Sequence, residues 1–308
     1  MTPRMHRARL KRLLVASAGV LAVALGLSSG EREPTAAPHA TPALARAANG
    51  EVSLDSGGLV RSYLLMVPPT PTGPLPLVVL LHGAFVTGSA EAARTGFGTL
   101  SASGAAVVVA PESHGPAWNS GAGCCGAAVT EHVDDLAFVQ SVIKDASARA
   151  SVDPARVYLV GYSSGGKLAY NVACSDRPKL AGVAVYGAGP QLPCDHPAPI
   201  SYVVGYGADD PNEPVHGAPT NTRGVHPALT DTMQQLRARA ECSAVPISRR
   251  GVGPADVTSW ESCGQSARVT QIVWRGNTHV WPGSQPGFPE SASGMTLFWP
   301  LLQRADRL

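Results

Sequence analysis

Short apolar runs alternate with longer amphipathic segments along most of the chain. Several of the apolar runs contain no polar residue, as expected for strands that are covered on both faces of a sheet. The complete set of strand-like runs is Tyr63–Val67, Leu75–Leu81, Ala105–Ala110, Val157–Gly161, Ala181–Tyr186, Ile200–Gly205 and Arg268–Trp274. Helical spacing is found in Glu131–Ala150, with Thr130 as its N-cap, and in Ser164–Cys174, Pro227–Ala240 and Ser291–Arg304. Strands that alternate with helices predict an α/β fold, with a mostly parallel central sheet flanked by helices and right-handed crossovers.

The first fifty residues do not follow this pattern. Five basic residues lie between Arg4 and Arg12, an apolar run of 15 residues extends from Leu13 to Leu27, and small residues follow it. This order is typical of a secretory signal peptide, and the run is shorter than the ~20 residues that a membrane-spanning helix needs. The first cysteine is Cys124, so no residue for a lipid anchor follows the run. We expect residues 1–30 to be a signal peptide, 31–50 an Ala- and Pro-rich spacer and 51–308 one folded domain of a secreted, extracellular protein without a stable membrane anchor.

Charge and cysteine content narrow the class of protein. Residues 1–30 hold five of the 24 Lys and Arg residues and none of the 22 Asp and Glu residues, so the mature chain has 19 basic against 22 acidic side chains and a formal charge of −3. The mature chain therefore lacks the excess of basic residues that is typical of proteins that bind nucleic acid. Six cysteines predict up to three disulfides in an oxidising compartment. A metal site is not expected, because Cys124 and Cys125 are adjacent and the chain has no Cys-x-x-Cys or paired-His spacing.

Ser163 lies where a strand pattern changes into a helix pattern. The pentapeptide 161–165 reads Gly-Tyr-Ser-Ser-Gly, which in this setting predicts a nucleophile elbow. A serine nucleophile needs a histidine to take its proton and a carboxylate to orient that histidine. His279 follows the last strand on a polar, glycine-containing loop, which suits an accessible base. Asp209 and Asp210 follow an earlier strand, and the residues themselves leave the choice between these two acids open.

Two backbone N–H groups are needed to bind the negative charge that forms on an attacked carbonyl oxygen. The N–H of Ser164 follows the nucleophile. After the strand that ends at Leu81, Gly83 lets the backbone turn so that the N–H of Ala84 points inward. His82 in this loop is predicted to brace the loop rather than to act as a base.

Three aromatic residues, Phe85, Trp118 and Trp281, lie on predicted loops near these groups. Exposed aromatic rings at such positions would line a substrate cleft, and the alternative is that each ring covers the core.

These segments resemble the secreted poly(3-hydroxybutyrate) depolymerase and feruloyl esterase family of α/β-hydrolases over most of residues 58–300. The similar segments are Leu80–Gly83 with Thr87-Gly88, the double-cysteine segment Asn119–Gly126, the stretch from Val133 through Asp153-Pro154 to Ser163 and Cys174, and His279–Gly283. The resemblance implies a single-domain α/β-hydrolase fold and cleavage of carboxylic ester bonds.

The same resemblance favours Asp210 as the acid, with Asp209 as the alternative. The family's His-Gly-Thr-x-Asp loop aligns with residues 206–210, where Tyr206 and Ala208 depart from the pattern.

For the cysteines, the resemblance implies that Cys242 pairs with Cys263 across a late hairpin. The partners of the other four are left open. A bond between the neighbours Cys124 and Cys125 is not expected, because adjacent residues meet the geometry of a disulfide only with strain.

The sequence therefore predicts a secreted serine esterase that acts through an acyl-enzyme and needs no cofactor, with Ser163, His279 and Asp210 as nucleophile, base and acid. The expected partner is an ester, either a hydroxyalkanoate oligomer or polymer or a feruloylated or acetylated polysaccharide. The alternatives are an acetyl esterase or peptidase of the same fold and a non-catalytic binding protein, against which the intact set of catalytic residues argues.

Overall fold

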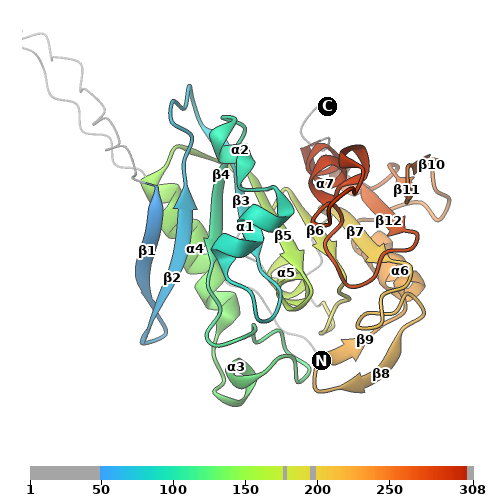
Figure 1. The fold of residues 1–308 in the computed structure, drawn as a ribbon, viewed down its shortest axis with the longest axis horizontal. Coiled ribbons are helices and arrows are strands. Elements are labelled where there is room, and N and C mark those ends of the chain that lie inside the picture. The colour runs from blue at the N-terminus through green and yellow to red at the C-terminus, as the bar shows by residue number, and fades with distance from the viewer. Residues whose placement is uncertain (1–48, 176–178, 195–198, 304–308) are drawn as a thin grey trace, which may run out of the picture. The chain divides into compact units, whose positions relative to one another are not determined.

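A computed structural model describes residues 49–175, 179–194 and 199–303, so the predicted signal peptide and nearly all of the spacer lie outside the described residues. Within these ranges, ten strands form one sheet in the order β1-β2-β4-β3-β5-β6-β7-β12-β11-β10 (Figure 1). The strands are β1 Gly50–Ser56, β2 Leu59–Met66, β3 Leu75–Leu81, β4 Val107–Pro111, β5 Val152–Tyr162, β6 Gly182–Tyr186, β7 Ser201–Gly207, β10 Ser248–Val252, β11 Ala255–Trp260 and β12 Val269–Trp274. The six strands from β4 to β12 in the sheet order pair in parallel, and the two at each edge pair antiparallel. The prediction of a mostly parallel sheet is confirmed.

Helices connect the parallel strands and cover both faces of the sheet. They are α1 Gly88–Thr95, α2 Thr99–Ala102, α3 Ala127–Thr130, α4 Asp135–Arg149, α5 Ser164–Ala173, α6 Leu229–Arg239 and α7 Gly294–Gln303, with short 3₁₀ turns η1 Gly264–Ser266 and η2 Glu290–Ala292. A separate two-stranded hairpin consists of β8 Ala218–Asn221 and β9 Gly224–His226.

The central strand β3 shows how the sheet is covered on both sides. Its residues Leu77, Val79 and Leu81 pack in one apolar cluster with residues of α4, α5 and α6. Val78 and Leu80 point the other way, into a second cluster with residues of α1, α2 and α7. Since successive side chains of a strand alternate between faces, this arrangement requires an uninterrupted apolar run, which is the pattern that the sequence has.

The predicted N-cap of the long helix at Thr130 is wrong. Thr130 belongs to the short helix α3, and α4 begins at Asp135 with Asp134 as its N-cap, whose carboxylate accepts a hydrogen bond of 2.9 Å from the N–H of Ala137. His132 between the two helices has a positive φ of 53°, which a continuous helix does not allow. Helical spacing alone did not show this interruption.

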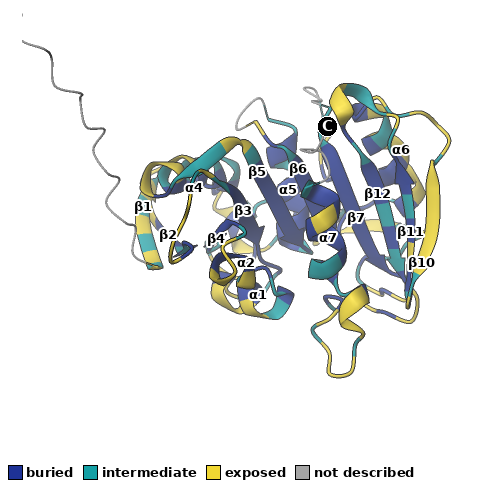
Figure 2. Ribbon diagram, turned by 90° about the horizontal axis from the view of Figure 1, so that it is seen from above, coloured by how far each residue is buried: buried dark blue, intermediate teal, exposed yellow. Residues whose placement is uncertain are grey.

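The outer strands carry few apolar residues, so the pattern of apolar runs missed several of them. β10, with the sequence Ser-Arg-Arg-Gly-Val, is exposed along nearly its whole length, whereas β6, β7 and the second half of β5 are buried (Figure 2). An edge strand with charged side chains resists pairing with other chains.

The topology brings the predicted site residues to one edge of the sheet. Ala84, Ser163, Asp210 and His279 follow β3, β5, β7 and β12, which are parallel to one another. The carboxyl ends of parallel strands lie at the same edge, where α/β sheets place their ligand sites.

Candidate active site

Ser163 lies in the sharp turn between β5 and α5. Its φ of 53° and ψ of −119° are a strained combination for a residue with a side chain. A Cβ on Gly161 would lie 2.6 Å from the carbonyl oxygen of Gly165, and a Cβ on Gly165 would clash with the carbonyl groups of Leu81 and His82. The two glycines thus let the turn and the helix pack closely against β3, and the turn presents the hydroxyl of Ser163 at the edge of the sheet.

His279 links Ser163 to Asp210. Its Nε2 lies 2.9 Å from Oγ of Ser163, and its Nδ1 lies 2.6 Å from Oδ2 of Asp210. A carboxylate can only accept hydrogen bonds, so Nδ1 beside it must be the N–H donor, and the tautomer with this proton leaves the lone pair of Nε2 to face the serine. This is the arrangement that general-base activation of a hydroxyl requires.

The histidine loop is held by partly buried hydrogen bonds. The hydroxyl of Tyr162 donates to the carbonyl of His279 over 2.6 Å, and that of Tyr186 donates to the carbonyl of Thr278 over 2.7 Å. The amide of Asn277 donates across the loop to the carbonyl of Val280 over 2.8 Å. Burial raises the pKa of Tyr162 to about 12, so its hydroxyl keeps the donor proton at neutral pH. These supports of the histidine did not emerge from the sequence analysis, because nothing in the sequence showed which loops the tyrosines reach.

The two candidate acids differ in their surroundings. Asp210 is buried, and its Oδ1 accepts hydrogen bonds from the N–H groups of Asn212, at 2.8 Å, and Glu213, at 2.9 Å, while Oδ2 faces His279. The neighbouring Asp209 is exposed. The structure therefore brings Asp210, and not Asp209, to the histidine, and Asp210 also caps the turn that follows it.

Ala84 and Ser164 both line the pocket that contains Ser163. Neither backbone N–H donates a hydrogen bond to another group of the described residues, so both are free to bind an oxyanion. The loop of Ala84 is fixed by a 2.7 Å hydrogen bond from the N–H of Phe85 to the carbonyl of Pro116.

His82 lies below this loop, as a brace would. Its Nε2 accepts from the N–H of Ser113 over 3.1 Å, its Nδ1 lies 2.8 Å from the carbonyl of Gly83, and its own carbonyl accepts from the indole of Trp118 over 2.8 Å. Burial lowers the pKa of His82, which the hydrogen bond to Gly83 opposes and the charge of Arg94 reinforces. His82 is therefore neutral and buried beside the loop, with its ring nitrogens already engaged.

A pocket of about 360 Å³ opens beside Ser163. One side is apolar, with Phe85, Pro116, Ala117 and Tyr162 in its lining. The ring of Phe85 is 87% exposed, so this residue lies where the sequence analysis placed it, on the surface beside the nucleophile.

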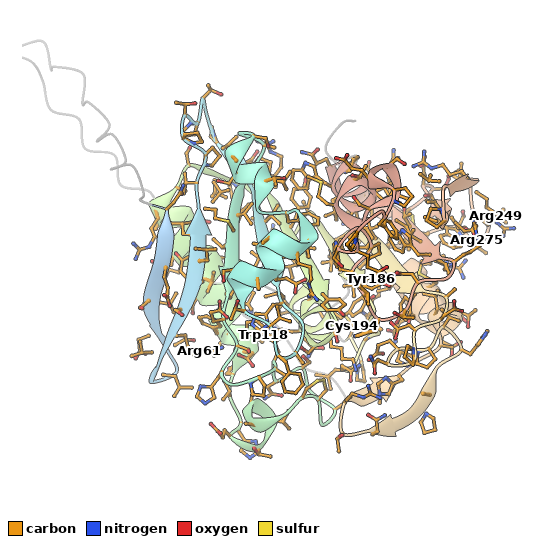
Figure 3. All side chains as sticks on the ribbon, viewed as in Figure 1. Arg61, Trp118, Tyr186, Cys194, Arg249 and Arg275 are labelled. Carbon is orange, nitrogen blue, oxygen red and sulfur yellow. A yellow bond between two sulfur atoms is a disulfide. The ribbon has the colours of Figure 1, made fainter. Side chains whose placement is uncertain are left out.

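The expectation that Trp118 and Trp281 line the cleft is wrong. Trp118 is fully buried against His82, with a distance of 4.8 Å between the ring centres (Figure 3). Trp281 is 1% exposed and packs edge-on against Phe97 and Tyr162. Both rings are part of the core because the loops that carry them fold back over the sheet, which the sequence pattern does not show.

Three charged residues of the pocket lining were absent from the sequence analysis. They are Lys167, Glu213 and Arg223. The ammonium of Lys167 lies 2.7 Å from a carboxylate oxygen of Glu213, and both side chains are buried. Burial lowers the pKa of Lys167, an effect that the charge of Glu213 opposes. The sequence carried a signal for this residue, since Lys167 is a charge on an apolar helix segment four positions after the nucleophile, hence on the same face.

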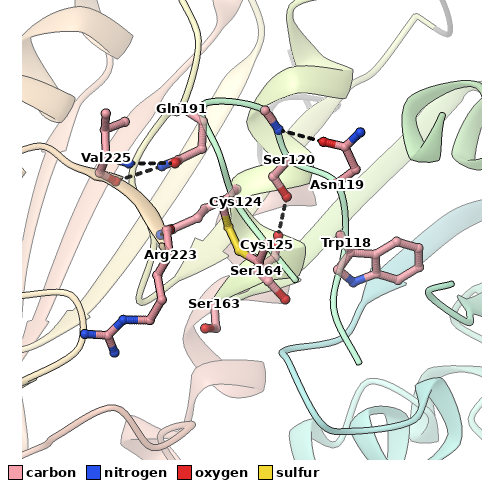
Figure 4. The surroundings of a disulfide bond; sticks show 12 residues. Trp118, Asn119, Ser120, Cys124, Cys125, Ser163, Ser164, Gln191, Arg223 and Val225 are labelled. Atoms are coloured by element: carbon pink, nitrogen blue, oxygen red, sulfur yellow. Dashed lines mark hydrogen bonds between the residues drawn. A yellow bond between two sulfur atoms is a disulfide. The ribbon is translucent and has the colours of Figure 1, made fainter. Parts of the chain in front are cut away.

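All six cysteines are paired. Cys242 is joined to Cys263 across the β10–β11 hairpin, as the resemblance implied, and Cys174 is joined to Cys194. Cys124 and Cys125 are joined to each other, so the expectation that these neighbours do not pair is wrong (Figure 4). Hydrogen bonds within the surrounding loop hold the two cysteines in place. The N–H of Cys124 donates to the carbonyl of Gly121, and the carbonyl of Cys124 accepts from the N–H of Ser120. Cys125 lines the pocket.

Two further features bear on the function. Across the residues that the structure describes, no group of three or more His, Cys, Asp or Glu side chains is arranged to bind a metal. Every helix in this part of the chain is too short or too polar to cross a membrane.

Comparisons with known proteins identify esterases. Residues 123–223 match the dienelactone hydrolase family. A protein of Nocardia uniformis subsp. tsuyamanensis named "Putative esterase NocK" is 30% identical over an alignment of 264 residues that covers 78% of this chain and 76% of that protein. A probable feruloyl esterase C of Aspergillus flavus is 25% identical over an alignment of 232 residues that covers 72% of this chain and 77% of that protein. An acetyl xylan esterase from Aspergillus awamori, 16% identical, has the same fold, with a TM-score of 0.51 over 72% of this chain and 90% of that one.

Proposed function

Because the chain belongs to the poly(3-hydroxybutyrate) depolymerase and feruloyl esterase family of α/β-hydrolases, we propose that it is a serine esterase with Ser163, His279 and Asp210 as its catalytic triad. The observation that carries this proposal is the continuous hydrogen-bonded line from Oγ of Ser163 through both nitrogens of His279 to a buried carboxylate. Two free N–H groups, of Ala84 and Ser164, line the same pocket.

In the first half of the reaction, Oγ of Ser163 attacks the ester carbonyl while Nε2 of His279 takes the hydroxyl proton. The N–H groups of Ala84 and Ser164 bind the negative charge that develops on the carbonyl oxygen. Asp210 stabilises the resulting imidazolium through Nδ1 and stays ionised. His279 then gives the proton to the alcohol oxygen, and the alcohol leaves an acyl group on Ser163.

In the second half, water takes the place of the alcohol. His279 removes a proton from the water, the hydroxide attacks the acyl carbonyl, and Ser163 leaves with that proton as the acid is released. These steps need no metal or organic cofactor, because every proton moves between Ser163, His279, the leaving alcohol and water.

The proposed substrates are esters of hydroxyalkanoates or feruloyl and acetyl esters of polysaccharides. The curated relative from Aspergillus flavus is named a probable feruloyl esterase, and the apolar side of the pocket suits the carbon skeleton of either acyl group. We further propose that residues 1–30 direct export and that the mature protein acts outside the cell, where its three disulfides persist.

The test is covalent labelling of the mature protein with a fluorophosphonate, combined with hydrolysis of 4-nitrophenyl butyrate. The wild-type protein is expected to be labelled at Ser163, and Ser163→Ala is expected to lose labelling and about 10⁴-fold or more of kcat. Unlabelled wild-type protein that also fails to hydrolyse the ester would instead indicate a non-catalytic binding protein of this fold.

A further inference from the structure

The tip of the β8–β9 hairpin places Arg223 in the lining of the pocket that contains Ser163. Its side chain is exposed to solvent and so accessible to a bound substrate. In Figure 4 the side chain extends from the hairpin on the Ser163 side of the Cys124–Cys125 disulfide.

Polar side chains, of which Lys167 and Gln191 are buried, fix the backbone of this tip. The N–H of Arg223 donates to the side chain of Asn221 over 2.8 Å, and its carbonyl accepts from the ammonium of Lys167 over 2.5 Å. The side-chain amide of Gln191 bonds both the N–H of Val225, at 3.0 Å, and its carbonyl, at 2.9 Å (Figure 4). The guanidinium is therefore carried by a tip that is tied to the nucleophile helix and to the loop of Gln191.

Close packing leaves the tip no room to move toward the disulfide. A Cβ on Gly224 would lie 2.8 Å from Cβ of Cys124, and the glycine has a φ of 93°. The hairpin thus contacts the disulfide that forms part of the pocket wall.

Of the charged side chains Lys167, Glu213 and Arg223 in the pocket lining, the first two form an ion pair and, within the described part of the chain, Arg223 does not. Lys167 and Glu213 form an ion pair at 2.7 Å and compensate each other. Arg223 donates from Nη1 to the neutral side chain of Asn212 over 2.5 Å. No acidic side chain of the described residues forms an ion pair with it. Arg223 thus contributes a positive charge to the lining of the pocket that contains Ser163, and among the described residues only Nη1 of its guanidinium has a hydrogen-bond acceptor.

We propose that Arg223 determines specificity by binding a carboxylate on the substrate, so that the enzyme prefers esters with an anionic group close to the scissile bond. This inference rests on the esterase function proposed above. A guanidinium presents planar, paired N–H donors that match the two oxygens of a carboxylate, and such charge-assisted bonds are stronger than neutral ones. Asn212 holds one end of the guanidinium, which reduces the rotational freedom lost on binding.

A carboxylate can belong to either half of the ester. In half-esters of dicarboxylic acids it lies on the acyl side. In the terminal unit of a hydroxyalkanoate oligomer it lies on the alcohol side, because the leaving hydroxy acid carries the free acid end. Arg223 would bind the carboxylate in the same way on either side of the ester. A pair of substrates for each side shows which of the two positions the enzyme recognises.

The experiment compares kcat/KM for two matched pairs on the mature, disulfide-bonded protein. The acyl-side pair is 4-nitrophenyl hemiglutarate and the neutral 4-nitrophenyl pentanoate. The alcohol-side pair is 3-acetoxybutyrate and the neutral 3-acetoxybutyramide, followed by titration of the released acid. We expect the wild-type protein to prefer the anionic member of at least one pair and Arg223→Gln to reduce that preference about tenfold.

Two variants serve as comparisons. Arg223→Lys keeps the charge but loses the paired donors, so it should retain part of the preference. Arg249→Gln removes an exposed arginine on the edge strand β10, far from the pocket (Figure 3), and should leave both the activity and the preference at the wild-type level. The preference should also shrink at high salt, since salt screens exposed charges.

An unchanged ratio in Arg223→Gln for both pairs, or the absence of any preference in the wild-type protein, would overturn the inference while neutral esters are still cleaved. Failure of the esterase function itself looks different, because no ester of either pair would be hydrolysed and Ser163 would not be labelled.

Discussion

Asp209 and Asp210 have the same side chain and adjacent positions, yet only Asp210 lies against His279. Asp210 is buried and accepts two backbone hydrogen bonds on the oxygen that does not face the imidazole. Those bonds fix the carboxylate, so that its second oxygen lies 2.6 Å from Nδ1 of His279. Asp209 is exposed on the other side of the turn, and its N–H donates to the carbonyl of Asn277 over 3.0 Å.

The first prediction concerns this pair. Asp210→Asn should lower kcat about 10⁴-fold, because an amide in place of the carboxylate favours the wrong tautomer of the histidine. Asp209→Asn removes a carboxylate of the same turn and should stay within about twofold of wild type. Steady-state kinetics with 4-nitrophenyl butyrate measures both, and a larger loss for the Asp209 variant would identify Asp209 as the acid.

At the scale of elements, the strand–turn–helix unit of β5 and α5 depends on glycines where the backbone of β3 comes close. The site of Gly165 has no space for a side chain, since the carbonyl groups of Leu81 and His82 fill it. Gly73, by contrast, has no atom within 4 Å of the position of a Cβ and an ordinary φ.

The second prediction is that Gly165→Ala lowers the free energy of unfolding by about 1–3 kcal/mol, as overpacking of a filled site does. It should also lower kcat, because the helix and the hydroxyl of Ser163 are displaced together. Urea denaturation and ester hydrolysis measure the two effects. Gly73→Ala is the matched control and should change neither; equal behaviour of the two variants would contradict the role of close packing.

The β10–β11 hairpin extends the sheet beyond β12 and carries little apolar surface on its outer strand. The Cys242–Cys263 disulfide closes a segment with a sequence separation of 21 that contains the hairpin. A bond that closes a loop of this length stabilises the folded state mainly by restricting the unfolded chain.

The third prediction is that replacing both cysteines, Cys242→Ala with Cys263→Ala, lowers the free energy of unfolding by about 3 kcal/mol. The kcat/KM should stay within about twofold of wild type, since neither residue lines the pocket. Urea denaturation measures the free energy of unfolding, and ester hydrolysis by the same preparation measures kcat/KM. A strong loss of activity in protein that is still folded would show that the hairpin supports the site directly.

At the scale of the whole molecule, burial shifts the titration of several groups away from their ordinary range. Burial lowers the pKa of His82 and raises the pKa values of Glu91 and Asp135, although Arg94 and Arg61 respectively oppose the latter two shifts. The effects on stability have opposite signs. A lowered histidine pKa makes folding less favourable as the pH falls, whereas raised carboxyl pKa values make it less favourable as the pH rises.

The fourth prediction concerns the contribution of His82 to the pH dependence of the free energy of unfolding. An unfolded histidine binds a proton below about pH 6.5, whereas His82 in the folded protein stays neutral to a lower pH. The stability that His82 contributes is therefore present above about pH 6.5 and is lost as the pH falls toward its folded pKa. Between pH 7.5 and 5.5 the wild-type protein should lose about 1 kcal/mol more than His82→Gln, measured by urea denaturation at both values. Parallel pH dependences of the two proteins would show that His82 is not held neutral.

The alternation of apolar strands and amphipathic helices determined the class of fold and the central strands, because burial on both faces of a sheet demands uninterrupted apolar runs. The Gly-x-Ser-x-Gly elbow marked the position of Ser163 for the same kind of local reason, since only glycine fits where two backbones meet. The edge strands β1, β10 and β11 are absent from the predicted apolar runs, because a strand with an exposed face carries no such run, and only the family resemblance implied the hairpin of β10 and β11.

The sequence by itself determined the central strands, most of the longer helices and the order in which the candidate residues follow them. Only the tertiary structure placed Asp210 rather than Asp209 against His279, paired Cys124 with Cys125, moved Trp118 and Trp281 into the core and brought Arg223 to the pocket. The reason is physical: local propensity and burial pattern act over a few neighbouring residues and can be read along the chain. Which of two adjacent side chains reaches a partner some seventy residues away depends on how distant loops fold back over the sheet.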